Sequence, residues 1–507
     1  MASQKHAITP TRANHFAEWY QEVIKAADLA EHSVVRGCMI IKPWGYALWE
    51  HIQSVLDQMI KATGHDNVYF PMLIPLSFLQ KEAAHVEGFA KECAVVTHYR
   101  LETDSSGQLA PAPDAKLTEA YIIRPTSETI IGDAMASWIQ TYKDLPIKIN
   151  QWANVMRWEM RTRLFLRTSE FLWQEGHTAH AIAEEAMQET LTMLDVYEKL
   201  ATDYLAIPVI KGEKTAGERF PGAVHTYCIE AMMQDGKALQ AGTSHFLGQN
   251  FAQANEIKYS DKTQKECYAW TTSWGVSTRL IGALIMVHSD DDGLALPPRI
   301  APKQIILIPV AMNDEDLARV MQYCEELSQT IHTQNYFGSP IRIAIDKTDQ
   351  RAGVKFWTAV KKGIPIRVEV GIREIEADLL SISLRQNSAK EKQTMSRATF
   401  VAECTKLLDS VHNSLFDRAL EYRVRNTVQI FSLNELEALY QNNEQQQSKF
   451  ALAYFDLSLE TDPTIEALLK KLKLTIRCIP FSADVEKGSC IFSKHLVSTQ
   501  VIFARSY

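Results

Sequence analysis

The sequence predicts an α+β domain with an antiparallel sheet flanked by helices, followed by an α/β domain and a small α+β C-terminal domain. Three observations predict this order. Charged and apolar residues alternate at residues 150–177, as in an antiparallel hairpin. Strand and helix patterns alternate after residue 303. The 507 residues exceed the length at which one hydrophobic core keeps growing, so two or three domains are expected.

The N-terminal part is predicted to hold helices and short strands. A helix rich in aromatic and acidic residues is expected at residues 15–29, and an amphipathic helix at 45–63, where apolar side chains recur at helical spacing. The following segment, VYFPMLIP, is a short strand broken by Pro71 and Pro75, as at a sheet edge or an interface. YIIRPTSETII, which starts at Tyr121, is then expected to be an apolar strand that turns into a helix.

The hairpin at residues 150–177 carries the most informative pattern. With a period of two, one face of its first strand holds Gln151, Val155, Arg157, Glu159 and Arg161. One face of the returning strand holds Phe171, Trp173, Glu175 and His177. A solvated sheet face is the alternative interpretation of such alternation. Because an indole stands beside a carboxylate and an imidazole, we expect an enclosed pocket with this hairpin as its floor.

The other elements of the first domain complete its sheet and helices. We expect helices at residues 183–205 and 277–287, and strands at 227–233, 239–245 and 268–273. Residues 293–303, GLALPPRIAPK, are a proline-stiffened linker. The first domain is therefore expected at residues 1–295.

The second and third domains differ in pattern from the first. Strands are predicted at residues 305–310, 341–345 and 366–370, and helices at 314–330 and 354–361, which is typical of a small α/β domain. We expect this domain at residues 303–400. A long charged helix from residue 398 leads into the last domain, expected at residues 401–507, with Ile476, Ile479 and Phe481 in its core.

Composition excludes several classes of protein. A net charge of −8 argues against indiscriminate nucleic-acid binding, so any such contact should be local. No apolar run is long enough to span a bilayer, and the N-terminus lacks the apolar region of a signal peptide. The eight cysteines are scattered without a C-x-x-C pair, which indicates reduced thiols. We expect a cytoplasmic protein without membrane association.

Four segments carry a specific resemblance. They are RPTSE at residues 124–128, VMRWEMRTRLFLRTSEFLWQEGHTAHA, LQAGTSHFLGQNF and TSWGVSTRLIGALIMVHSDDDGL. With them the chain resembles class II aminoacyl-tRNA synthetases, and among these the prolyl-tRNA synthetases of archaeal and eukaryotic type, over essentially its whole length. The resemblance implies that the helix at residues 45–63 and the strand after it form a homodimer interface. It also implies that the hairpin and Arg279 belong to the two motifs that bind ATP.

The resemblance implies activation of proline by ATP, followed by transfer to tRNA(Pro). Such a site needs fixed cations around the phosphates, for which Arg157 and Arg279 are the catalytic candidates. Glu159 would accept from the adenine amino group while Phe165 or a neighbour stacks on the ring, and Gln240 and Thr243 would bind the ribose and phosphate side. Magnesium should accompany ATP. Glu230 is the candidate magnesium ligand, although a structural carboxylate is equally consistent with the sequence.

The same resemblance implies a proline pocket. Thr126 and Glu128 would bind the secondary ammonium of proline, and Arg157 its carboxylate. Phe171 and Trp173 would enclose the ring, Glu175 would orient His177, and Ser273 would complete the site. No segment between the hairpin and Arg279 is long enough for the hydrolytic domain of some relatives, so correction of mischarged tRNA is expected to come from elsewhere.

Two expectations concern the later domains. Lys355, Arg367 and Glu369 resemble the anticodon contacts of the family and would meet phosphates or base edges, with a solvated charged face as the alternative. Many relatives bind structural zinc through four cysteines, whereas here only Cys490 stands at such a position and Ser493 replaces the next one. We therefore expect no zinc.

Two other functions compete with this interpretation. A synthetase-like regulatory protein without catalysis is disfavoured, because Arg157, Arg279, Thr126 and Glu128 are all present. A synthetase for threonine or glycine is disfavoured by RPTSE together with WQEGHTAH.

Overall fold

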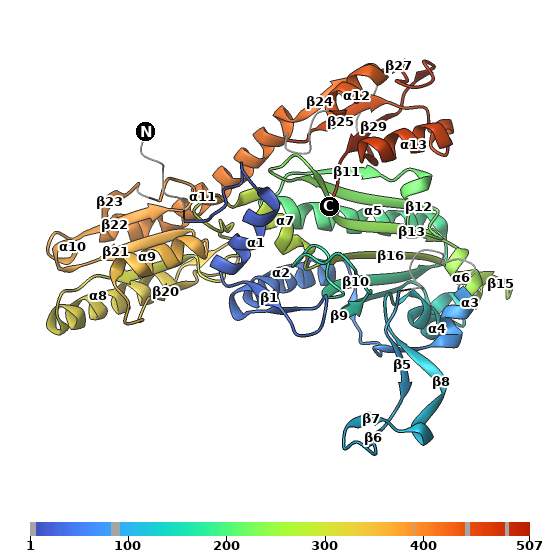
Figure 1. Ribbon diagram of the computed structural model, residues 1–507, viewed down its shortest axis with the longest axis horizontal. Coiled ribbons are helices and arrows are strands. Elements are labelled where there is room, and N and C mark those ends of the chain that lie inside the picture. Colours follow the sequence, from blue (N-terminus) through green and yellow to red (C-terminus); the bar gives the residue numbers. More distant parts are fainter. Residues whose placement is uncertain (1–6, 83–91, 390, 442–446, 482–485) are drawn as a thin grey trace.

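The computed structural model describes residues 7–82, 92–389, 391–441, 447–481 and 486–507. A central body of sheet and helices has a second unit at one side, a C-terminal unit above it and a thin arm of strands below it (Figure 1). This arrangement confirms the α+β body with an additional α/β unit that the sequence predicts.

One continuous sheet runs through the central body into the C-terminal unit. Its strands are, in spatial order, β24 (Thr427–Ile430), β25 (Phe450–Tyr454), β29 (Gln500–Ala504), β26 (Thr475–Pro480), β11 (Val209–Glu213), β12 (His225–Met232), β13 (Ala238–Gly248), β16 (Trp270–Ser277), β10 (Glu170–His180), β9 (Ile147–Met156) and β3 (Asp66–Asn67). Neighbouring strands are antiparallel except β24 with β25 and β3 with β9. The pairing of β26 with β11 joins the C-terminal unit to the body, whereas the sequence predicts separate domains.

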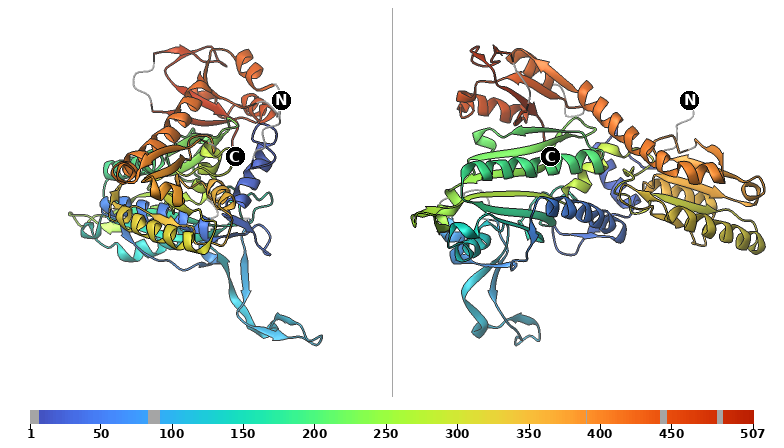
Figure 2. Two further views of the ribbon diagram at one scale, coloured as in Figure 1. Left: turned by 90° about the vertical axis from the view of Figure 1, so that its left-hand side faces the viewer. Right: turned by 180° about the vertical axis from the view of Figure 1, so that it is seen from behind.

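Helices cover one face of this sheet. Seen from behind, α2 (Pro43–Ala62) and α5 (Ala183–Lys199) lie on the near face of the sheet (Figure 2). The helix predicted at residues 183–205 consists of α5 followed by a π-helical turn at Leu200–Tyr204. The helix α7 (Arg279–His288) is mostly apolar, and every residue after Arg279 is buried. The N-terminal helix α1 (Phe16–Ala26) packs against α7.

The hairpin of β9 and β10 is shorter than predicted. Its first strand ends at Met156, so Arg157, Glu159 and Arg161 do not continue a strand face. Beyond Met156 the alternate side chains Trp158 and Met160 have no core to cover and are 45% and 61% exposed. The chain folds into a loop instead, closed by a hydrogen bond from Arg157 N to Ser169 O of 2.7 Å.

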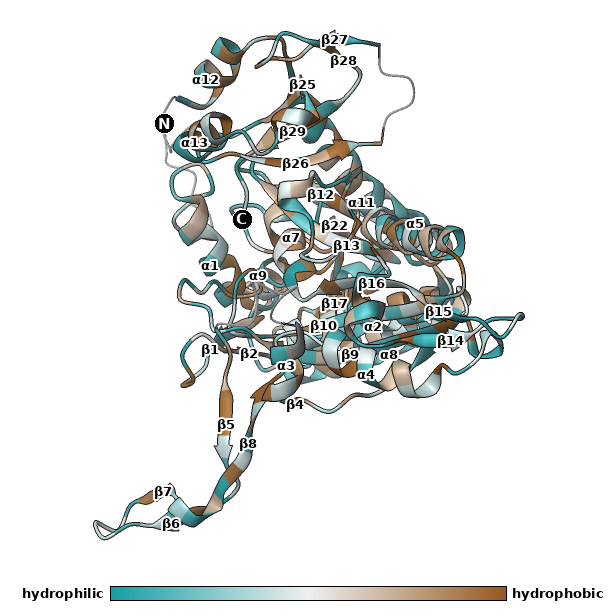
Figure 3. Cartoon of the chain, turned by 90° about the vertical axis from the view of Figure 1, so that its right-hand side faces the viewer, coloured by the Kyte–Doolittle hydropathy of each residue, from teal (hydrophilic) through white to brown (hydrophobic). Residues whose placement is uncertain are grey.

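The arm belongs to the segment between β4 (Leu73–Pro75) and α4 (Glu128–Trp138). Its described strands are β5 (Val95–His98), β6 (Leu101–Thr103), β7 (Leu109–Pro111) and β8 (Lys116–Ile123). At the base β8 pairs with β4 and with β5. Apolar residues occur along the exposed strands of the arm (Figure 3).

The second unit has the α/β order that the sequence predicts. Its sheet has the order β20 (Ile343–Ile345), β17 (Ile305–Pro309), β21 (Ile366–Val370), β22 (Leu379–Leu384) and β23 (Gln393–Ser396). The helices of this unit are α8 (Asp314–His332), α9 (Ala352–Lys361) and α10 (Ile372–Glu376). The three predicted strands and two predicted helices are all present, with ends that differ by at most two residues.

The long helix α11 (Arg397–Arg425) connects the second unit to the C-terminal unit (Figure 1). Its first half is buried in the second unit through Phe400, Cys404 and Leu408, so the expected limit at residue 400 falls inside a helix. The C-terminal unit adds α12 (Leu433–Gln441) and α13 (Pro463–Leu472). Ile476 lies in its core and Ile479 packs against it, but Phe481 is 49% exposed and packs on Tyr227 instead, so its predicted core position is wrong.

Short elements connect these parts. They are β1 (Ala30–His32), β2 (Met39–Ile41), α3 (Leu76–Glu82), η1 (Pro113–Ala115), η2 (Tyr142–Asp144), η4 (Ala216–Glu218), α6 (Asn250–Ala254), β14 (Lys258–Ser260), β15 (Glu266–Tyr268), β18 (Asn335–Tyr336), β19 (Ser339–Pro340), η5 (Leu457–Leu459), β27 (Gly488–Ser489) and β28 (Leu496–Val497). Of these, η4 contributes directly to the site described next.

Candidate active site

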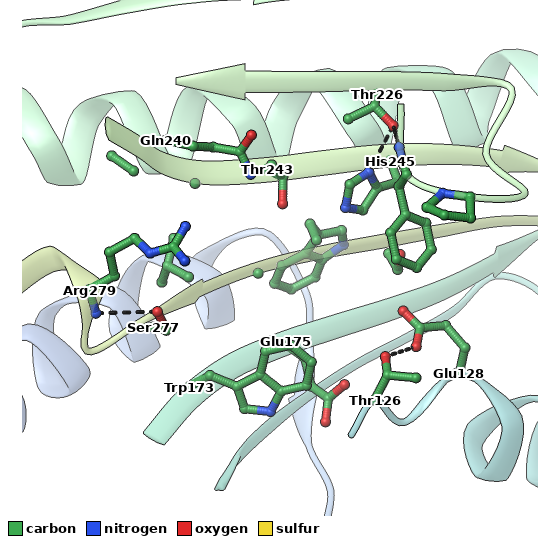
Figure 4. Close-up of a pocket in the computed structure, with 18 of the residues that line it drawn as sticks. Thr126, Glu128, Trp173, Glu175, Thr226, Gln240, Thr243, His245, Ser277 and Arg279 are labelled. Atoms are coloured by element: carbon green, nitrogen blue, oxygen red, sulfur yellow. Dashed lines mark hydrogen bonds between the residues drawn. The ribbon is translucent and has the colours of Figure 1, made fainter. Parts of the chain in front are cut away.

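A pocket of about 310 Å³ opens on the sheet face opposite α5 (Figure 4). Strands β10, β13 and β16 surround it, and the turn between β8 and α4 closes one end. The loop after β11, residues 215–223, contributes Glu218, Arg219, Phe220 and Pro221 to the lining and is called the roof loop. The other lining residues are Thr126, Glu128, Arg157, Phe171, Trp173, Glu175, His177, Thr226, Gln240, Ala241, Gly242, Thr243, His245, Ser273, Trp274, Gly275, Val276, Ser277 and Arg279.

Alternation along β10 decides which of its side chains reach the pocket. Gln174 points to the helical face, where it hydrogen-bonds the hydroxyl of Tyr197 in α5 over 2.7 Å. Glu175 therefore points to the pocket. Gly176 pairs with Trp274, and a Cβ on this glycine would lie 2.0 Å from the indole ring. Gly176 is thus required because the indole of Trp274, on the neighbouring strand β16, packs where a side chain would lie.

The structure brings together most of the residues that the sequence assigned to substrates. The predicted residues that line the pocket are Thr126, Glu128, Arg157, Phe171, Trp173, Glu175, His177, Gln240, Thr243, Ser273 and Arg279. They come from segments up to about 150 residues apart in the chain. Glu159, Phe165 and Glu230 are not among the lining residues.

Glu175 is the centre of a buried hydrogen-bond network in the pocket floor. Its Oε1 accepts from Ser127 Oγ over 2.6 Å and from Gln151 Nε2 over 2.8 Å, and Oε2 lies 3.1 Å from His177 Nε2. Burial opposes the charged carboxylate, but these partners outweigh burial and lower the pKa of Glu175. Burial likewise opposes an imidazolium, yet the hydrogen bond and charge of Glu175 raise the pKa of His177. Both directions indicate a charged Glu175–His177 pair.

The end of the pocket near α4 offers groups for a small polar ligand. Thr126 Oγ1 donates a hydrogen bond to the carboxylate of Glu128. Ser273 Oγ and Trp173 Nε1 are buried and have no hydrogen-bond partner within the described parts of the chain. Buried polar atoms are usually paired, so these two donors are available to a bound molecule.

Two arginines provide the positive charge of the pocket. Arg157 Nε donates to Pro125 O over 2.9 Å, and its guanidinium lies 5.7 Å and 5.6 Å from the ring centres of Phe171 and Trp173. Burial lowers the pKa of Arg157, and the charges of Glu128 and Glu175 oppose this shift. Burial, together with the charges of Arg157 and Arg167, lowers the pKa of Arg279 to about 10. At neutral pH both guanidinium groups remain charged, and their mutual repulsion favours an anion between them.

The residues that cover the pocket were not predicted from the sequence. Phe220 of the roof loop stacks on His245, with ring centres 4.6 Å apart, and Thr226 Oγ1 lies 3.0 Å from His245 Nδ1. Burial lowers the pKa of His245 to about 3, so this imidazole is neutral. A period of two from Thr243 would have placed His245 on the same face. The roof loop itself has no periodic signal.

Two residues expected at the adenine do not line this pocket. Glu159 Oε2 pairs with Arg167 Nη2 over 2.9 Å, outside the pocket lining. Phe165 adopts a left-handed backbone conformation, with φ of 62°, and its ring is buried in the main hydrophobic core. The predicted stacking of Phe165 on a base is contradicted by this burial. The alternative that a neighbouring residue stacks there stays open.

Glu230 is engaged in a buried ion-pair network. Its Oε1 accepts from Lys214 Nζ over 2.8 Å and from Arg477 Nη2 over 2.9 Å, and Oε2 accepts from Arg477 Nε over 3.2 Å. Its side chain is 0% exposed. Both oxygens are therefore occupied, which argues against the expected role as a magnesium ligand and favours a structural carboxylate. Within the described ranges, no group of three or more histidine, cysteine, aspartate or glutamate side chains is placed to hold a metal ion.

The three expected tRNA contacts are buried or paired in the second unit. Lys355 Nζ donates to Asp346 O over 3.1 Å, and Glu369 pairs with Lys392. Arg367 is 1% exposed, and no nitrogen of its guanidinium has a hydrogen-bond partner among the residues that the structure describes. The alternative of a solvated charged face is therefore wrong for Arg367.

The C-terminal unit contains the isolated cysteine of the expected degenerate zinc site. Cys490 is buried, and its Sγ accepts from Asp456 N over 3.3 Å. Ser493 Oγ donates to Asp456 Oδ2 over 3.3 Å. The terminal Tyr507 donates to Asp235 Oδ2 over 2.6 Å and lies beside Arg163 of the loop after β9. None of the helices in the described chain combines the length and apolarity needed to span a bilayer.

Two family profiles match the chain. The profile described as "tRNA synthetase class II core domain (G, H, P, S and T)" matches residues 109–288. The profile described as "Anticodon binding domain" matches residues 304–407. The first includes the pocket, and the second includes the sheet that carries Arg367 and Glu369.

Individual proteins match over nearly the whole chain. The proline–tRNA ligase of Bdellovibrio bacteriovorus is 56% identical over 506 residues, and that of Protochlamydia amoebophila is 53% identical over 504 residues, with 99% of each chain covered in both comparisons. A crystal structure of prolyl-tRNA synthetase from Cryptosporidium parvum complexed with L-proline and AMP has a TM-score of 0.86 and 34% identity, covering 99% of this chain and 97% of that chain. A structure of the same enzyme complexed with halofuginone and AMPPNP has a TM-score of 0.87 and 35% identity, with the same coverage.

Proposed function

Because this chain belongs to the prolyl-tRNA synthetase family of class II synthetases, we propose that its main pocket is where proline reacts with ATP. The activity is that of a proline–tRNA ligase. A proline carboxylate oxygen attacks the α-phosphorus of ATP, the bond to the bridging oxygen breaks, and pyrophosphate leaves. A hydroxyl of the terminal ribose of tRNA(Pro) then attacks the carbonyl carbon of prolyl-adenylate, and AMP leaves.

The convergence of Arg157 and Arg279 on one pocket carries the assignment of the phosphate site. The transition state concentrates negative charge around the α-phosphorus, and fixed guanidinium groups stabilise such charge without reorganisation. Arg157 stands at the junction between the aromatic wall and Glu128, where it can contact both the proline carboxylate and the α-phosphate. Arg279, together with Gln240 and Thr243, serves the nucleotide end.

Proline would occupy the end that Thr126 and Glu128 close. Its secondary ammonium has two N–H donors, which suit the carboxylate of Glu128 and the hydroxyl of Thr126. The apolar ring would rest on Trp173 and Phe171. The unpartnered Ser273 Oγ and the charged Glu175–His177 pair complete a floor whose polar atoms a proline can satisfy. The C. parvum enzyme crystallised with L-proline and AMP supports this assignment by similarity.

We propose that magnesium accompanies ATP, since it neutralises the polyphosphate by binding its oxygens. Glu230 does not fit as a magnesium ligand, because its carboxylate already accepts hydrogen bonds from Lys214 and Arg477. No protein ligand is therefore assigned. For the C-terminal unit we propose that no zinc is bound, with Cys490 alone at the expected position, and elemental analysis that finds one tightly held zinc per chain would refute this.

We propose that the second unit reads the anticodon of tRNA(Pro) through Lys355, Arg367 and Glu369. The support is the unsatisfied guanidinium of Arg367, because a buried arginine without hydrogen bonds is unusual and suits a base edge or phosphate. Arg367→Met should reduce aminoacylation of tRNA and leave proline-dependent pyrophosphate exchange unchanged. Arg373→Met, on the exposed surface of α10, is the matched control. Equal aminoacylation by both variants would remove Arg367 from this role.

The remaining proposals concern the whole molecule. We propose a cytoplasmic homodimer of the archaeal and eukaryotic type. The full-length similarity to the C. parvum enzyme supports the type, although the bacterial relatives are more similar in sequence. The division into domains at residues 1–295, 303–400 and 401–507 is also retained as a proposal, with α11 shared by the last two.

The decisive experiment for the function is pyrophosphate exchange with each of the twenty amino acids in turn. We expect exchange with proline and a much weaker response to alanine, which is smaller than the pocket requires. Stronger exchange with threonine or glycine than with proline would overturn the assignment.

A further inference from the structure

The roof loop follows strand β11, and β11 pairs with a strand of the C-terminal unit. Strand β11 lies between β12 on one side and β26 of the C-terminal unit on the other, where Gly212 pairs with Pro480 and Glu213 with Ile479. Lys214 and the roof loop follow β11 directly. The cover of the pocket therefore begins at the junction between the two units.

A first contact holds the start of the roof loop. Glu460 Oε2 of the C-terminal unit accepts a hydrogen bond of 2.8 Å from Ala216 N, in the turn η4. The same turn contains Glu218, and Phe220 follows it to stack on His245. In Figure 4, His245 and Thr226 lie across the pocket from Glu128 and Thr126. This contact thus acts on the end of the pocket assigned to proline.

A second contact is the buried network of Lys214, Glu230 and Arg477. Lys214 Nζ donates to Glu230 Oε1 and also, over 2.5 Å, to the carbonyl oxygen of Arg477. Arg477 belongs to β26 and binds Glu230 through Nε and Nη2. A residue of the C-terminal unit thereby completes a charge network inside the body.

This network adjoins the nucleotide end of the pocket. Glu230 pairs in register with Gln240, which lines the pocket beside Arg279 at the end opposite Glu128 (Figure 4). The charges of Glu230 and Arg477 also act on Arg279, the former raising and the latter lowering its pKa. The two contacts of the C-terminal unit therefore reach different ends of one pocket.

We propose that Glu460 and Arg477 are positioning residues of the active site, with Glu460 setting the affinity for proline through the roof loop and Arg477 the affinity for ATP through Glu230. The C-terminal unit thereby contributes to substrate binding by positioning the roof loop and Glu230. Neither residue touches a substrate. The inference rests on the proposed function of the pocket, and the experiment separates the two.

The experiment measures KM for proline, KM for ATP, kcat and the thermal midpoint of the full-length protein by pyrophosphate exchange and calorimetry. For Glu460→Ala we expect KM for proline to rise roughly fivefold, the factor that one ordinary hydrogen bond provides, with KM for ATP unchanged. Arg477→Lys keeps the charge beside Glu230 but loses the paired geometry, so we expect a rise of about the same factor in KM for ATP alone.

The matched control is Asp462→Asn. Asp462 lies two residues from Glu460 and caps α13 through Thr464 N and Ile465 N, without a contact to the roof loop. Because asparagine caps a helix about as well as aspartate, this change should leave the thermal midpoint and both KM values nearly unchanged. If Asp462→Asn raises KM for proline as much as Glu460→Ala, or if both test variants only lower kcat or the midpoint, the positioning roles are refuted. Failure of the proposed function would instead appear as absent proline-dependent exchange in the unmodified protein.

Discussion

His177 Nε2 lies 3.1 Å from Glu175 Oε2 in the floor of the pocket, and both side chains are buried. The two residues are next-but-one neighbours in β10 and so share the pocket face of the sheet. Ser127 and Gln151 bind the other carboxylate oxygen, which leaves the negative charge of Glu175 fully paired. The floor of the site is therefore a fixed ion pair, and its loss should affect both stability and proline binding.

Glu175→Gln should destabilise the protein while keeping the volume of the side chain. The neutral amide no longer supports a protonated His177, and hydrogen bonds to a charged group are stronger than neutral ones, so we expect a loss of about 2 kcal/mol in the free energy of unfolding. Urea denaturation measures this loss, and KM for proline should rise in parallel. Glu170→Gln, at the exposed end of the same strand, is the control and should change stability by less than about 0.5 kcal/mol. Equal effects of both changes would contradict a buried ion pair.

The pair should also give a defined pH dependence. Glu175 raises the pKa of His177 above its ordinary value of 6.5, so the native state retains a proton that the unfolded chain releases above that pH. The stabilisation is complete below pH 6.5 and is lost as the pH rises through the native pKa. We expect the difference in thermal midpoint between the unmodified protein and His177→Asn to shrink as the pH rises above 6.5. If the difference in thermal midpoint grew with pH instead, the pKa of His177 could not be raised in the native state, and the prediction would be wrong.

Arg157→Ala should abolish adenylate formation in a folded protein. The guanidinium acts on charge that develops in the transition state, and loss of one such donor typically costs roughly a hundredfold or more in rate. Proline-dependent pyrophosphate exchange measures the effect, and circular dichroism checks the fold. Arg100→Ala on the arm, whose exposed guanidinium pairs with Asp114 outside the pocket lining, should retain full exchange. Near-normal exchange by Arg157→Ala would remove this residue from catalysis.

Buried neutral histidines should make the protein sensitive to mild acid. Burial lowers the pKa of His180 to about 4 and those of His288 and His412 to about 3, whereas the unfolded chain takes up these protons near pH 6.5. Each such histidine therefore reduces stability as the pH falls below 6.5, by at most about 1.4 kcal/mol per pH unit. Thermal midpoints should fall between about pH 6.5 and about pH 5.5. His412→Gln should reduce this slope, and a stability that rises on acidification would contradict the prediction.

Dimer formation should depend on the exposed apolar residues between α2 and the arm. Tyr69 is 76% exposed in the single chain, and Met72 and Leu73 near it are also exposed. Obligate dimers bury large apolar surfaces, usually more than about 2,000 Å². We expect light scattering to give twice the mass of one chain, and Tyr69→Glu with Leu73→Glu to give one chain mass. Val424→Glu, at an exposed apolar position of α11, should remain dimeric, and a dimer that survives the double change would place the interface elsewhere.

Much of the site could be predicted because its signals are local in the chain. A period of two places Trp173, Glu175 and His177 on one face of β10, and a strand followed by an apolar helix places Arg279 at a helix start. The same period failed beyond Met156, because the alternation of Arg157, Glu159 and Arg161 continues where no neighbouring core requires a strand. Periodicity describes one strand and does not show where its partner ends.

By itself, then, the sequence determined the order of the three units, the apolar and polar faces of their strands, and the motifs that place the pocket. Only the tertiary structure decided that β26 extends the central sheet at β11 and that Arg477 binds Glu230, the residue expected to hold magnesium. A buried carboxylate needs a cation, but that cation can come from any strand that packing brings near, here one 247 residues away in the chain. Such pairings depend on which sheet edges remain open and which charges become buried, and neither is encoded in local periodicity.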